Sequence, residues 1–372
     1  MKTHVIFAPC WCDAGHGRHH GLRAPVTIVV VLWVGLLAAR DARALMLKPG
    51  DIVAAGASAI FRVDPVTGNR EIIADDVTGT GPDFWSAKVA VDRRGDVIAV
   101  ATRADQPLET MVLRIDAATG NRNVIADDNV GTGPDFPVRG ITIEPSGDIL
   151  LLARCSIIRL DPGTGDRTVV SGDSIGEGPG FVSLHGLAVT ETQGIFAVDD
   201  GSSGEEGPEL LFHVNPTTGD RTIVSGMSVG DGPRLSSPEE AVVDANGNLL
   251  VISDIFSLVS DAAVLRVDPS SGDREIFTGA PVGDGPLFDD LDDIAIDLNG
   301  NVVLVDFDRN AIFRVDAMTG DRTILSDSSV GSGPEFVHLR SLAIVPVPEP
   351  GTLTFAFWAL GAILLPRGRT RG

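Results

Sequence analysis

The chain has 372 residues with 43 Gly and 23 Pro, too many turn-forming residues for a mainly helical protein, and its 43% hydrophobic content is enough for a buried core. Its formal net charge is −22, so nucleic acid is not expected as a partner, because binding to phosphates requires a basic surface. An acidic surface suits cations, or simply keeps the protein in solution.

The first 44 residues have the order of a secretory signal. Scattered basic residues precede an apolar run at about 26–39, and the small-x-small sequence "ARA" follows at 42–44. We expect cleavage after about Ala44. Removal of this segment would also remove Cys10 and Cys12, so that only Cys155 would remain and no internal disulfide could form.

Residues 45–347 contain six copies of one repeat. The segment "FRVDPVTGNR" at 61–70 is the first copy of its best-marked part. The copies lie roughly 50 residues apart, a period at which each repeat is one supersecondary unit. The other copies are at 113–122, 158–167, 212–221, 265–274 and 313–322.

Each unit contains four short runs with the alternation and the β-branched residues of strands. We label them a, b, c and d in chain order. In the second unit they are "KVAVD" (88–92), "DVIAVA" (96–101), "MVLRID" (111–116) and "NRNVIAD" (121–127). Six units of four strands predict an all-β fold, a six-bladed β-propeller with four-stranded blades.

The two ends of the array predict how the ring closes. The first unit begins at "GDIVAAG" (50–56), which is a strand b without a strand a. The last unit is followed by "LRSLAIV" (339–345), which is a strand a without a continuation. Together they complete one blade, and such closure leaves no open sheet edge.

The pattern of strands a and b, as in "GITIEPSGDILLLA" (140–153) and "DIAIDLNGNVVLVD" (293–306), resembles NHL-type repeats and the regucalcin and gluconolactonase-like propellers. The resemblance spans all six units and implies the propeller fold. It implies less about function, since these families include binding scaffolds, lactonases and lyases. The lactonase-like relatives use a metal site of Glu, Asn and Asp in the central channel.

The stretch "VGTGPDF" at 130–136 recurs with changes in all six units. A phosphate-binding loop would need a following helix, often with Lys-Ser/Thr, and the sequence has neither at these positions. We interpret the stretch as the crossing from strand d of one blade to strand a of the next. Glycine would allow the bends, and Phe would fill the gap between neighbouring sheets. The recurrent Arg of strand c and the Arg after the c–d turn are interpreted as structural, pairing with carboxylates of the repeat.

The connections predict two unlike faces. In an antiparallel blade, the d–a crossings and b–c loops share one face, and the a–b and c–d turns share the other. The c–d turns are nearly identical in all units, whereas the b–c loops differ in length. We call these the variable face and the uniform face. Variable loops on a constant scaffold are typical of binding, and drift in surface loops is the alternative.

Charged residues of both signs gather where strand a begins, at the predicted mouth of the channel on the variable face. Two ends of strand b add carboxylates. The pattern leaves three hypotheses open: a salt-bridged plug, a site for a polar ligand or for a divalent cation such as calcium with oxygen ligands, and a catalytic centre. No residue is assigned a catalytic role. The candidates are Arg139, His185, Glu239, Glu240, Asp292, Asp293, Arg340, Asp199 and Asp306.

Residues 348–372 form a second terminal signal. Pro348, Glu349 and Pro350 precede an apolar run at 353–365 and three arginines. This order resembles the PEP-CTERM sorting signal of Gram-negative bacteria. The resemblance implies export, transient anchoring in the inner membrane and processing by an exosortase-type enzyme.

These features favour an exported binding or interaction module at the bacterial surface or in the extracellular matrix. Its partners would be exopolysaccharide or surface proteins. Two alternatives stay open at this point. One is a metal-dependent lactonase-like hydrolase with its site at the channel mouth, and the other is a purely structural matrix protein.

Overall fold

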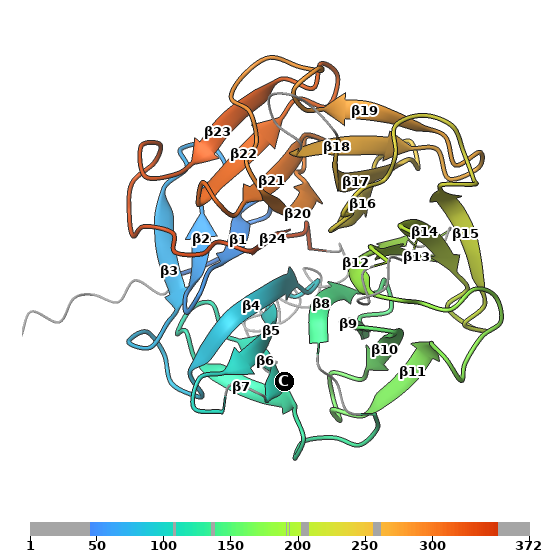
Figure 1. Cartoon of the computed structure of the whole chain (residues 1–372). Coiled ribbons are helices and arrows are strands. Elements are labelled where there is room, and N and C mark those ends of the chain that lie inside the picture. The colour runs from blue at the N-terminus through green and yellow to red at the C-terminus, as the bar shows by residue number, and fades with distance from the viewer. Residues whose placement is uncertain are drawn as a thin grey trace, which may run out of the picture. The chain divides into compact units, whose positions relative to one another are not determined.

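The computed structural model describes residues 45–106, 109–134, 138–190, 192, 194–201, 208–255 and 262–348. Within these ranges the chain forms 24 strands in six four-stranded antiparallel sheets, arranged as blades around a central axis (Figure 1). The predicted six-bladed propeller is therefore confirmed. No helix in the described ranges is long and apolar enough to cross a membrane.

The strands of each blade follow one another from the axis outward. The first blade is β24 (Ser341–Ile344), β1 (Ile52–Ala55), β2 (Ile60–Val63) and β3 (Arg70–Ala74). The second is β4 (Phe84–Val91), β5 (Val97–Arg103), β6 (Thr110–Ile115) and β7 (Arg122–Ala126). The third is β8 (Val138–Ile143), β9 (Ile149–Ala153), β10 (Ser156–Leu160) and β11 (Arg167–Ser171).

The other three blades repeat this order. The fourth is β12 (Leu184–Thr190), β13 (Gly194–Asp199), β14 (Leu210–Val214) and β15 (Arg221–Gly226). The fifth is β16 (Ala241–Val243), β17 (Leu249–Asp254), β18 (Ala262–Val267) and β19 (Arg274–Thr278). The sixth is β20 (Leu291–Ile296), β21 (Val302–Asp306), β22 (Ala311–Val315) and β23 (Arg322–Ser326).

The ring closes in the first blade, as predicted. The last strand, β24, pairs with the first strand, β1, in a register that runs from Ile52↔Ile344 to Ala55↔Ser341. At the end of this pairing Gly50 N donates to Val345 O at 2.9 Å, and Val345 N donates to Asp51 O at 2.9 Å. The chain thus enters and leaves the ring at one place, where the other blades have their a–b turn.

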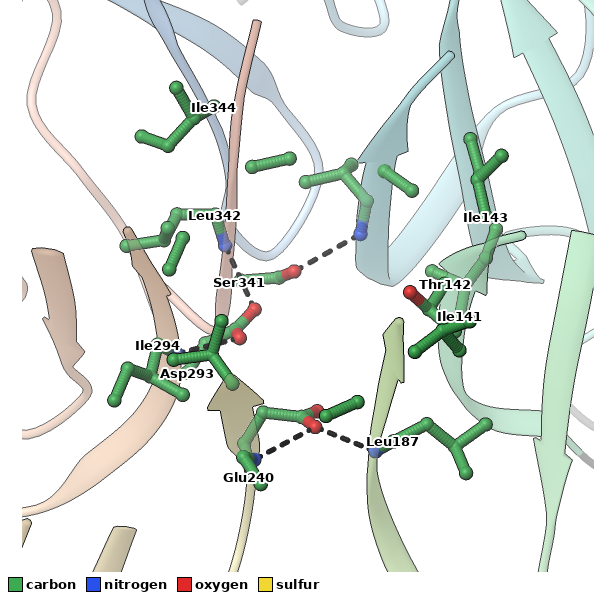
Figure 2. Close-up of a pocket in the computed structure, with 18 of the residues that line it drawn as sticks. Ile141, Thr142, Ile143, Leu187, Glu240, Asp293, Ile294, Ser341, Leu342 and Ile344 are labelled. Atoms are coloured by element: carbon green, nitrogen blue, oxygen red, sulfur yellow. Dashed lines mark hydrogen bonds between the residues drawn. The ribbon is translucent and has the colours of Figure 1, made fainter. Parts of the chain in front are cut away.

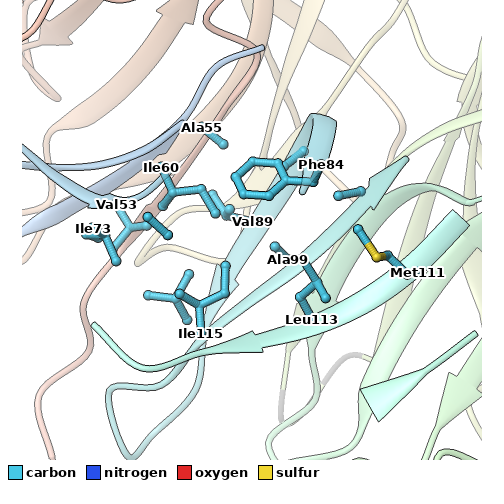
Figure 3. Packing of buried hydrophobic residues seen from close by; sticks show 14 of the residues in the cluster. Val53, Ala55, Ile60, Ile73, Phe84, Val89, Ala99, Met111, Leu113 and Ile115 are labelled. Atoms are coloured by element: carbon cyan, nitrogen blue, oxygen red, sulfur yellow. The ribbon is translucent and has the colours of Figure 1, made fainter. Parts of the chain in front are cut away.

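The core lies between neighbouring blades. Figure 3 shows one of its clusters, in which Val53 and Ile60 of the first blade lie against Val89, Leu113 and other residues of the second. All are 4% exposed or less. Burial of each such side chain contributes roughly 1.5–3 kcal/mol. Because both faces of each sheet are covered in this way, most residues in the sequence of each strand are apolar.

The repeated Gly-x-Gly-Pro crossings join each blade to the next. Gly79 has φ 82°, and a Cβ there would lie 1.9 Å from the carbonyl oxygen of Gly120, which belongs to the c–d turn of the following blade. The same close approach recurs at Gly131, where a Cβ would lie 1.8 Å from Gly165 O. Glycine is therefore needed for steric reasons, and the structural interpretation of the crossing is confirmed.

The arginine that follows each c–d turn clasps the crossing. Arg322 donates from Nε to Pro286 O at 2.8 Å and from Nη1 to Val282 O at 2.7 Å. The partner shared by every copy is the carbonyl of the crossing proline. The structural role of this arginine is thus confirmed. The predicted pairing with carboxylates was mostly wrong, because the guanidinium instead donates to backbone carbonyls of a tightly bent segment. The equivalent bonds are made by Arg70, Arg122, Arg167, Arg221 and Arg274.

The arginines of strand c do pair with carboxylates. Arg62 Nε lies 2.7 Å from Asp51 Oδ2, and Arg314 Nε lies 3.2 Å from Asp297 Oδ2. In each pair the carboxylate belongs to the a–b turn or its equivalent. These ion pairs hold strand c to the uniform face.

The two faces differ as the sequence indicates. Every c–d turn has the length of the first, which connects Val63 to Arg70. The b–c loops run from the short connection between β9 and β10 to the long one between β13 and β14. Structural variation is therefore concentrated on the variable face.

Candidate functional site

The inner strands of the six blades surround a cavity of about 460 Å³ along the axis of the ring (Figure 2). Most of the residues that line it are apolar, among them Ile141, Leu187, Ile294 and Leu342. Polar side chains from equivalent positions of four inner strands form one level of the wall, nearer the variable face. We call Lys88, Glu240, Asp293 and Ser341 the polar tier.

The polar tier links the inner strands of neighbouring blades. Asp293 Oδ2 accepts from Leu342 N at 2.9 Å, and its Oδ1 accepts from Ile294 N at 2.8 Å. Ser341 Oγ accepts from Val89 N at 3.1 Å. Inner strands of different blades are not paired in a ladder, so these side chains supply the acceptors that a neighbouring strand would otherwise provide.

Glu240 belongs to the same level and reaches toward the fourth blade. Its Oε1 accepts from Leu187 N at 2.8 Å (Figure 2). The equivalent residue of that blade is Gly186, where a Cβ would lie 2.5 Å from this Oε1. Gly186 therefore leaves the room that the Glu240 side chain occupies.

The tier has an unusual charge distribution. Burial, together with the charge of Asp293, raises the pKa of Glu240 to about 8. Burial alone would lower the pKa of Lys88, but the carboxylates of Asp293, Asp292, Glu240 and Glu239 outweigh it, so that this pKa is raised. Lys88 Nζ donates to the backbone oxygen of Asp292 at 3.1 Å. Lys88 is thus a cation held among carboxyl groups.

A second level, the rim, lies one residue earlier in each strand. We use this name for Arg139, His185, Glu239, Asp292 and Arg340. On one side His185 Nδ1 lies 2.8 Å from Glu239 Oε2, and its Nε2 lies 3.2 Å from Asp200 Oδ2. Arg139 Nη1 lies 3.5 Å from the same Nε2.

The two carboxylates favour a positively charged imidazole. The hydrogen bond to Glu239 is the main cause that raises the pKa of His185, and burial opposes it. A histidine whose two ring nitrogens both face carboxylates is a poor general base at neutral pH.

The other side of the rim is an ion pair. Arg340 Nη1 lies 3.1 Å from Asp292 Oδ2, and the Arg340 guanidinium carbon lies 4.1 Å from the centre of the Phe307 ring. The Arg340 side chain is 42% exposed. The rim is therefore a row of ion pairs whose outer surface remains accessible.

The structure places Asp199 and Asp306 apart from these levels. Both are at the end of a strand b, as the sequence indicates, but they are 1% and 0% exposed. Asp199 accepts from Val182 N at 2.7 Å and from Ser183 N at 2.9 Å, and Asp306 accepts from Asp289 N at 2.8 Å. These carboxylates fasten the crossing segment to the blade.

The residues of the channel do not fit a divalent metal ion. In the described part of the chain, no three His, Cys, Asp or Glu side chains lie in an arrangement that could hold one. Asp293 uses both oxygens for backbone N–H groups, and Asp292 pairs with Arg340. The Lys88 ammonium adds a positive charge where a metal would need ligands.

The sequence interpretation omitted two features of this region. Lys88 and Ser341 were not among the candidates, although they stand at positions equivalent to Glu240 and Asp293. The exposed side chains of Trp85 (54%) and Val337 (57%) were also missed. Backbone hydrogen bonds link the segments that carry these two residues through Ala57. Ser86 N donates to Ala57 O, and Ala57 N donates to Val337 O, each at 2.8 Å.

Ala44, at the expected signal cleavage, lies outside the described residues, as do Glu349 and Pro350 of the sorting motif. The boundaries of the terminal segments therefore stay predictions.

No protein-family model matches this sequence, and no curated protein matches it either. Solved structures match its fold. A nidogen–laminin complex has a chain with 12% identity and a TM-score of 0.58, and the match covers 80% of this chain and 99% of that one. TolB of Acinetobacter baumannii has 13% identity and a TM-score of 0.55, with 80% and 67% covered.

A gluconolactonase of Xanthomonas campestris is also similar, with 15% identity, a TM-score of 0.52, and 80% and 91% of the two chains covered. At these identities the likeness shows the propeller fold alone. It agrees with the resemblance to NHL-type and gluconolactonase-like repeats.

Proposed function

We propose that this protein is an exported binding module that takes a partner on the variable face of its propeller. One observation carries the proposal. The glycine turns, the crossings and the arginine clasps recur in all six blades, whereas the charged rim, the polar tier and the b–c loops differ from blade to blade. A scaffold alone has no need for that difference at one end of the ring.

The exposed side chains of Trp85 and Val337 support this proposal, and the surroundings of Trp85 indicate the kind of partner. Beside Trp85 is a cavity of about 220 Å³ lined by Asp75, Asp76 and Asp83, among others. An exposed indole flanked by carboxylates favours Lys or Arg side chains, through cation–π contact and charge attraction. A surface protein with basic side chains suits the acidic surroundings of Trp85 better than an exopolysaccharide.

Export and anchoring remain part of the proposal on the strength of the two terminal signals. Because the described chain enters and leaves the ring beside Gly50 and Val345, on the uniform face, an anchor beyond residue 348 would leave the variable face turned away from the membrane. Loss of residues 348–372 is then expected to release the protein from the cell envelope, as measured by cell fractionation.

Substitutions on the two faces test the binding surface. Trp85→Ala/Val337→Ser is expected to lower affinity for surface proteins of the producing bacterium at least about tenfold, because aromatic anchors dominate interfaces. The matched control is Val66→Ser/Met318→Ser, which removes two apolar side chains, 86% and 95% exposed, from turns of the uniform face.

Binding is measured on immobilised surface proteins and, separately, on isolated exopolysaccharide. Equal affinity of the two variants for both preparations would refute the assignment of the face. If the native chain bound only exopolysaccharide and Trp85→Ala/Val337→Ser lost this binding, the variable face would still be the binding surface. The partner would then be a polysaccharide rather than a protein.

A further inference from the structure

Exposed apolar side chains are unevenly distributed over the uniform face. The third residue of the c–d turn, counted from its initial Asp or Asn, is Val66 in the first blade and Met318 in the sixth. These side chains are 86% and 95% exposed. The equivalent residues of the other four blades are small or polar, namely Ala118, Gly163, Thr217 and Ser270. Only the blade that closes the ring and its neighbour therefore present a large apolar residue at this position.

More exposed apolar side chains lie where the chain enters and leaves the ring. Met46 is 76% exposed, Val347 is 63% exposed, and Leu298 in the a–b turn of the sixth blade is 51% exposed. Leu298 lies beside the entry, because a Cβ at Gly50 would be 3.2 Å from Leu298 Cδ1. The two blades thus carry apolar side chains on both their inner and their outer turns.

One arginine connects the inner and outer turns. Arg314 Nε lies 3.2 Å from Asp297 Oδ2, and Arg314 Nη2 donates to Pro65 O at 2.9 Å. Leu298 and Val66 are the residues that directly follow these two partners. Among the described residues, no a–b or c–d turn of the other four blades has an exposed large apolar side chain. We call the set the closure patch, which consists of Met46, Val66, Leu298, Met318 and Val347.

The length of the chain beyond the described residues indicates what covers the closure patch. The apolar run at 353–365 begins five residues after Pro348, and five residues reach at most about 18 Å when fully extended. The headgroup layer on each side of a bilayer is about 5–7 Å thick. If the run lies in the membrane, as the sorting-signal resemblance implies, the tether keeps the closure patch close to the headgroups.

The charges of the inner turns beside the closure suit lipid headgroups. Lys48 precedes β1, and Arg93 and Arg94 lie in the a–b turn of the second blade, whereas the other a–b turns contain no Lys or Arg. Basic side chains beside exposed apolar ones are typical of surfaces that lie in the headgroup region. The c–d turns also carry carboxylates, and the net charge is −22, so these residues would not hold the chain on anionic lipid without the tether.

We propose that the closure patch is a lipid contact. In the anchored protein, the first and sixth blades rest in the headgroup region through the closure patch, and Lys48, Arg93 and Arg94 face anionic headgroups. The propeller then has one preferred orientation on the membrane instead of turning freely on its tether. The inference rests on the anchoring part of the function proposed above.

The test compares one turn position in two blades on opposite sides of the ring, the first and the fourth (Figure 1). The full chain, with Cys10, Cys12 and Cys155 replaced by Ser, is placed in vesicles of phosphatidylethanolamine and phosphatidylglycerol. A nitrobenzoxadiazole dye is attached at Val66→Cys or, as the matched control, at Thr217→Cys. Both native side chains are exposed. The dye at the first position is expected to be blue-shifted and quenched by lipid spin-labelled near its headgroup, and the dye at the second is not.

Substitutions elsewhere in the closure patch make the result specific. In the chain labelled at Val66→Cys, Leu298→Ser/Val347→Ser is expected to lower the ratio of docked to undocked molecules about tenfold, because burial of two aliphatic side chains is lost. The control is Ile175→Ser/Met227→Ser, which removes two exposed apolar side chains of the crossings and should leave the ratio unchanged. Neither pair is expected to change affinity for the partner of the variable face, which is measured without lipid.

Flotation of the vesicles separates the two proposals. If the labelled chain floats with the vesicles but the dye has the same emission at both positions, the anchor stands and the lipid contact is refuted. If the chain does not float, the anchor is wrong and this inference fails with it. A dye at Val66→Cys that is blue-shifted but not quenched by spin-labelled lipid would mean that protein, such as a second copy of the chain, covers the closure patch, which also overturns the inference.

Discussion

The contact between Arg322 and the neighbouring crossing gives the most direct test of how the blades are joined. Arg322 is 3% exposed, and its guanidinium donates to Pro286 O (2.8 Å), Gly279 O (2.9 Å), Val282 O (2.7 Å) and Gly283 O (3.1 Å). Arg322→Met keeps much of the volume but removes every donor. The carbonyls of a buried bend would then lack partners.

The magnitude follows from these contacts. Hydrogen bonds from charged donors contribute about 1.5–3 kcal/mol each, but members of one network are not additive. We therefore expect a loss of roughly 3–5 kcal/mol in the free energy of unfolding, because several buried carbonyls lose their donor at about 1–3 kcal/mol each and these costs do not add in full. For a domain of this size, that corresponds to a decrease of about 6–15 °C in melting temperature.

The assay is thermal unfolding followed by circular dichroism, with limited proteolysis of the crossing at 279–287 as a local measure. Arg309→Met is the matched control, because the Arg309 side chain is 35% exposed and its Nε lies 3.0 Å from Asp289 Oδ2, whose side chain is 51% exposed. An exposed pair of this kind contributes about 0–1 kcal/mol. If Arg322→Met melted within about 2 °C of the control, the clasp would not be what joins the blades.

Three further predictions concern the channel. Gly186→Ala is expected to destabilise the fold by about 1–3 kcal/mol, because its Cβ would lie 2.5 Å from Glu240 Oε1 and 2.7 Å from Glu239 O. Gly140→Ala, whose nearest contact would be 3.3 Å, should be milder, and denaturant titrations that rank the two in the opposite order would contradict this. Glu240→Gln is expected to gain stability relative to the native chain as pH rises from about 4.5 to about 8. The Glu240 carboxyl binds its proton more tightly in the folded state, so the native chain becomes less stable over that interval and the glutamine variant does not. A difference in melting temperature between the two proteins that does not change with pH would refute this. For His185, whose pKa is raised in the fold, the stabilisation should be complete below about 6.5 and lost as pH rises through the folded value, so His185→Asn should cost most stability at pH 6 and least at pH 9 in melting experiments.

The sequence was sufficient for the architecture because the physical causes of a propeller repeat along the chain. Six similar strand patterns, six glycine crossings and the two incomplete end units predict the ring and its closure. The blade that contains β1 and β24 could be derived from "GDIVAAG" and "LRSLAIV" alone, since neither segment can complete a sheet by itself.

The direction of individual charged side chains could not be predicted in the same way. An arginine beside many carboxylates reads as an ion pair, yet Arg322 bonds to backbone carbonyls that become available only when the crossing bends. Asp306 was correctly expected at the end of a strand, but its oxygens turn to the backbone of the crossing. Such choices depend on packing between blades, which no single repeat contains.

The candidate site shows the same limit. Divergence among the repeats located the rim and the polar tier, and it identified all four of their acidic members. It gave less weight to Lys88, because a pattern of carboxylates suggests metal ligands until the position of the Lys88 ammonium group is known. The pairing of β4 with β5 is irregular between Trp85 and Lys88, and the sequence alone does not reveal this irregularity.

The closure of the ring also determines how the molecule would carry mechanical force. A pull between the two ends of the chain would load the Ile52↔Ile344 pair first and separate β24 from β1 one bond at a time. A pull between a membrane anchor and a partner held on the variable face would instead draw β24 along its own axis, so that all its bonds to β1 resist together. In that direction the links from Asp293 to Leu342 and from Ser341 to Val89 add resistance from the sixth and second blades. The polar tier would then serve as a fastening for the strand that carries the tether.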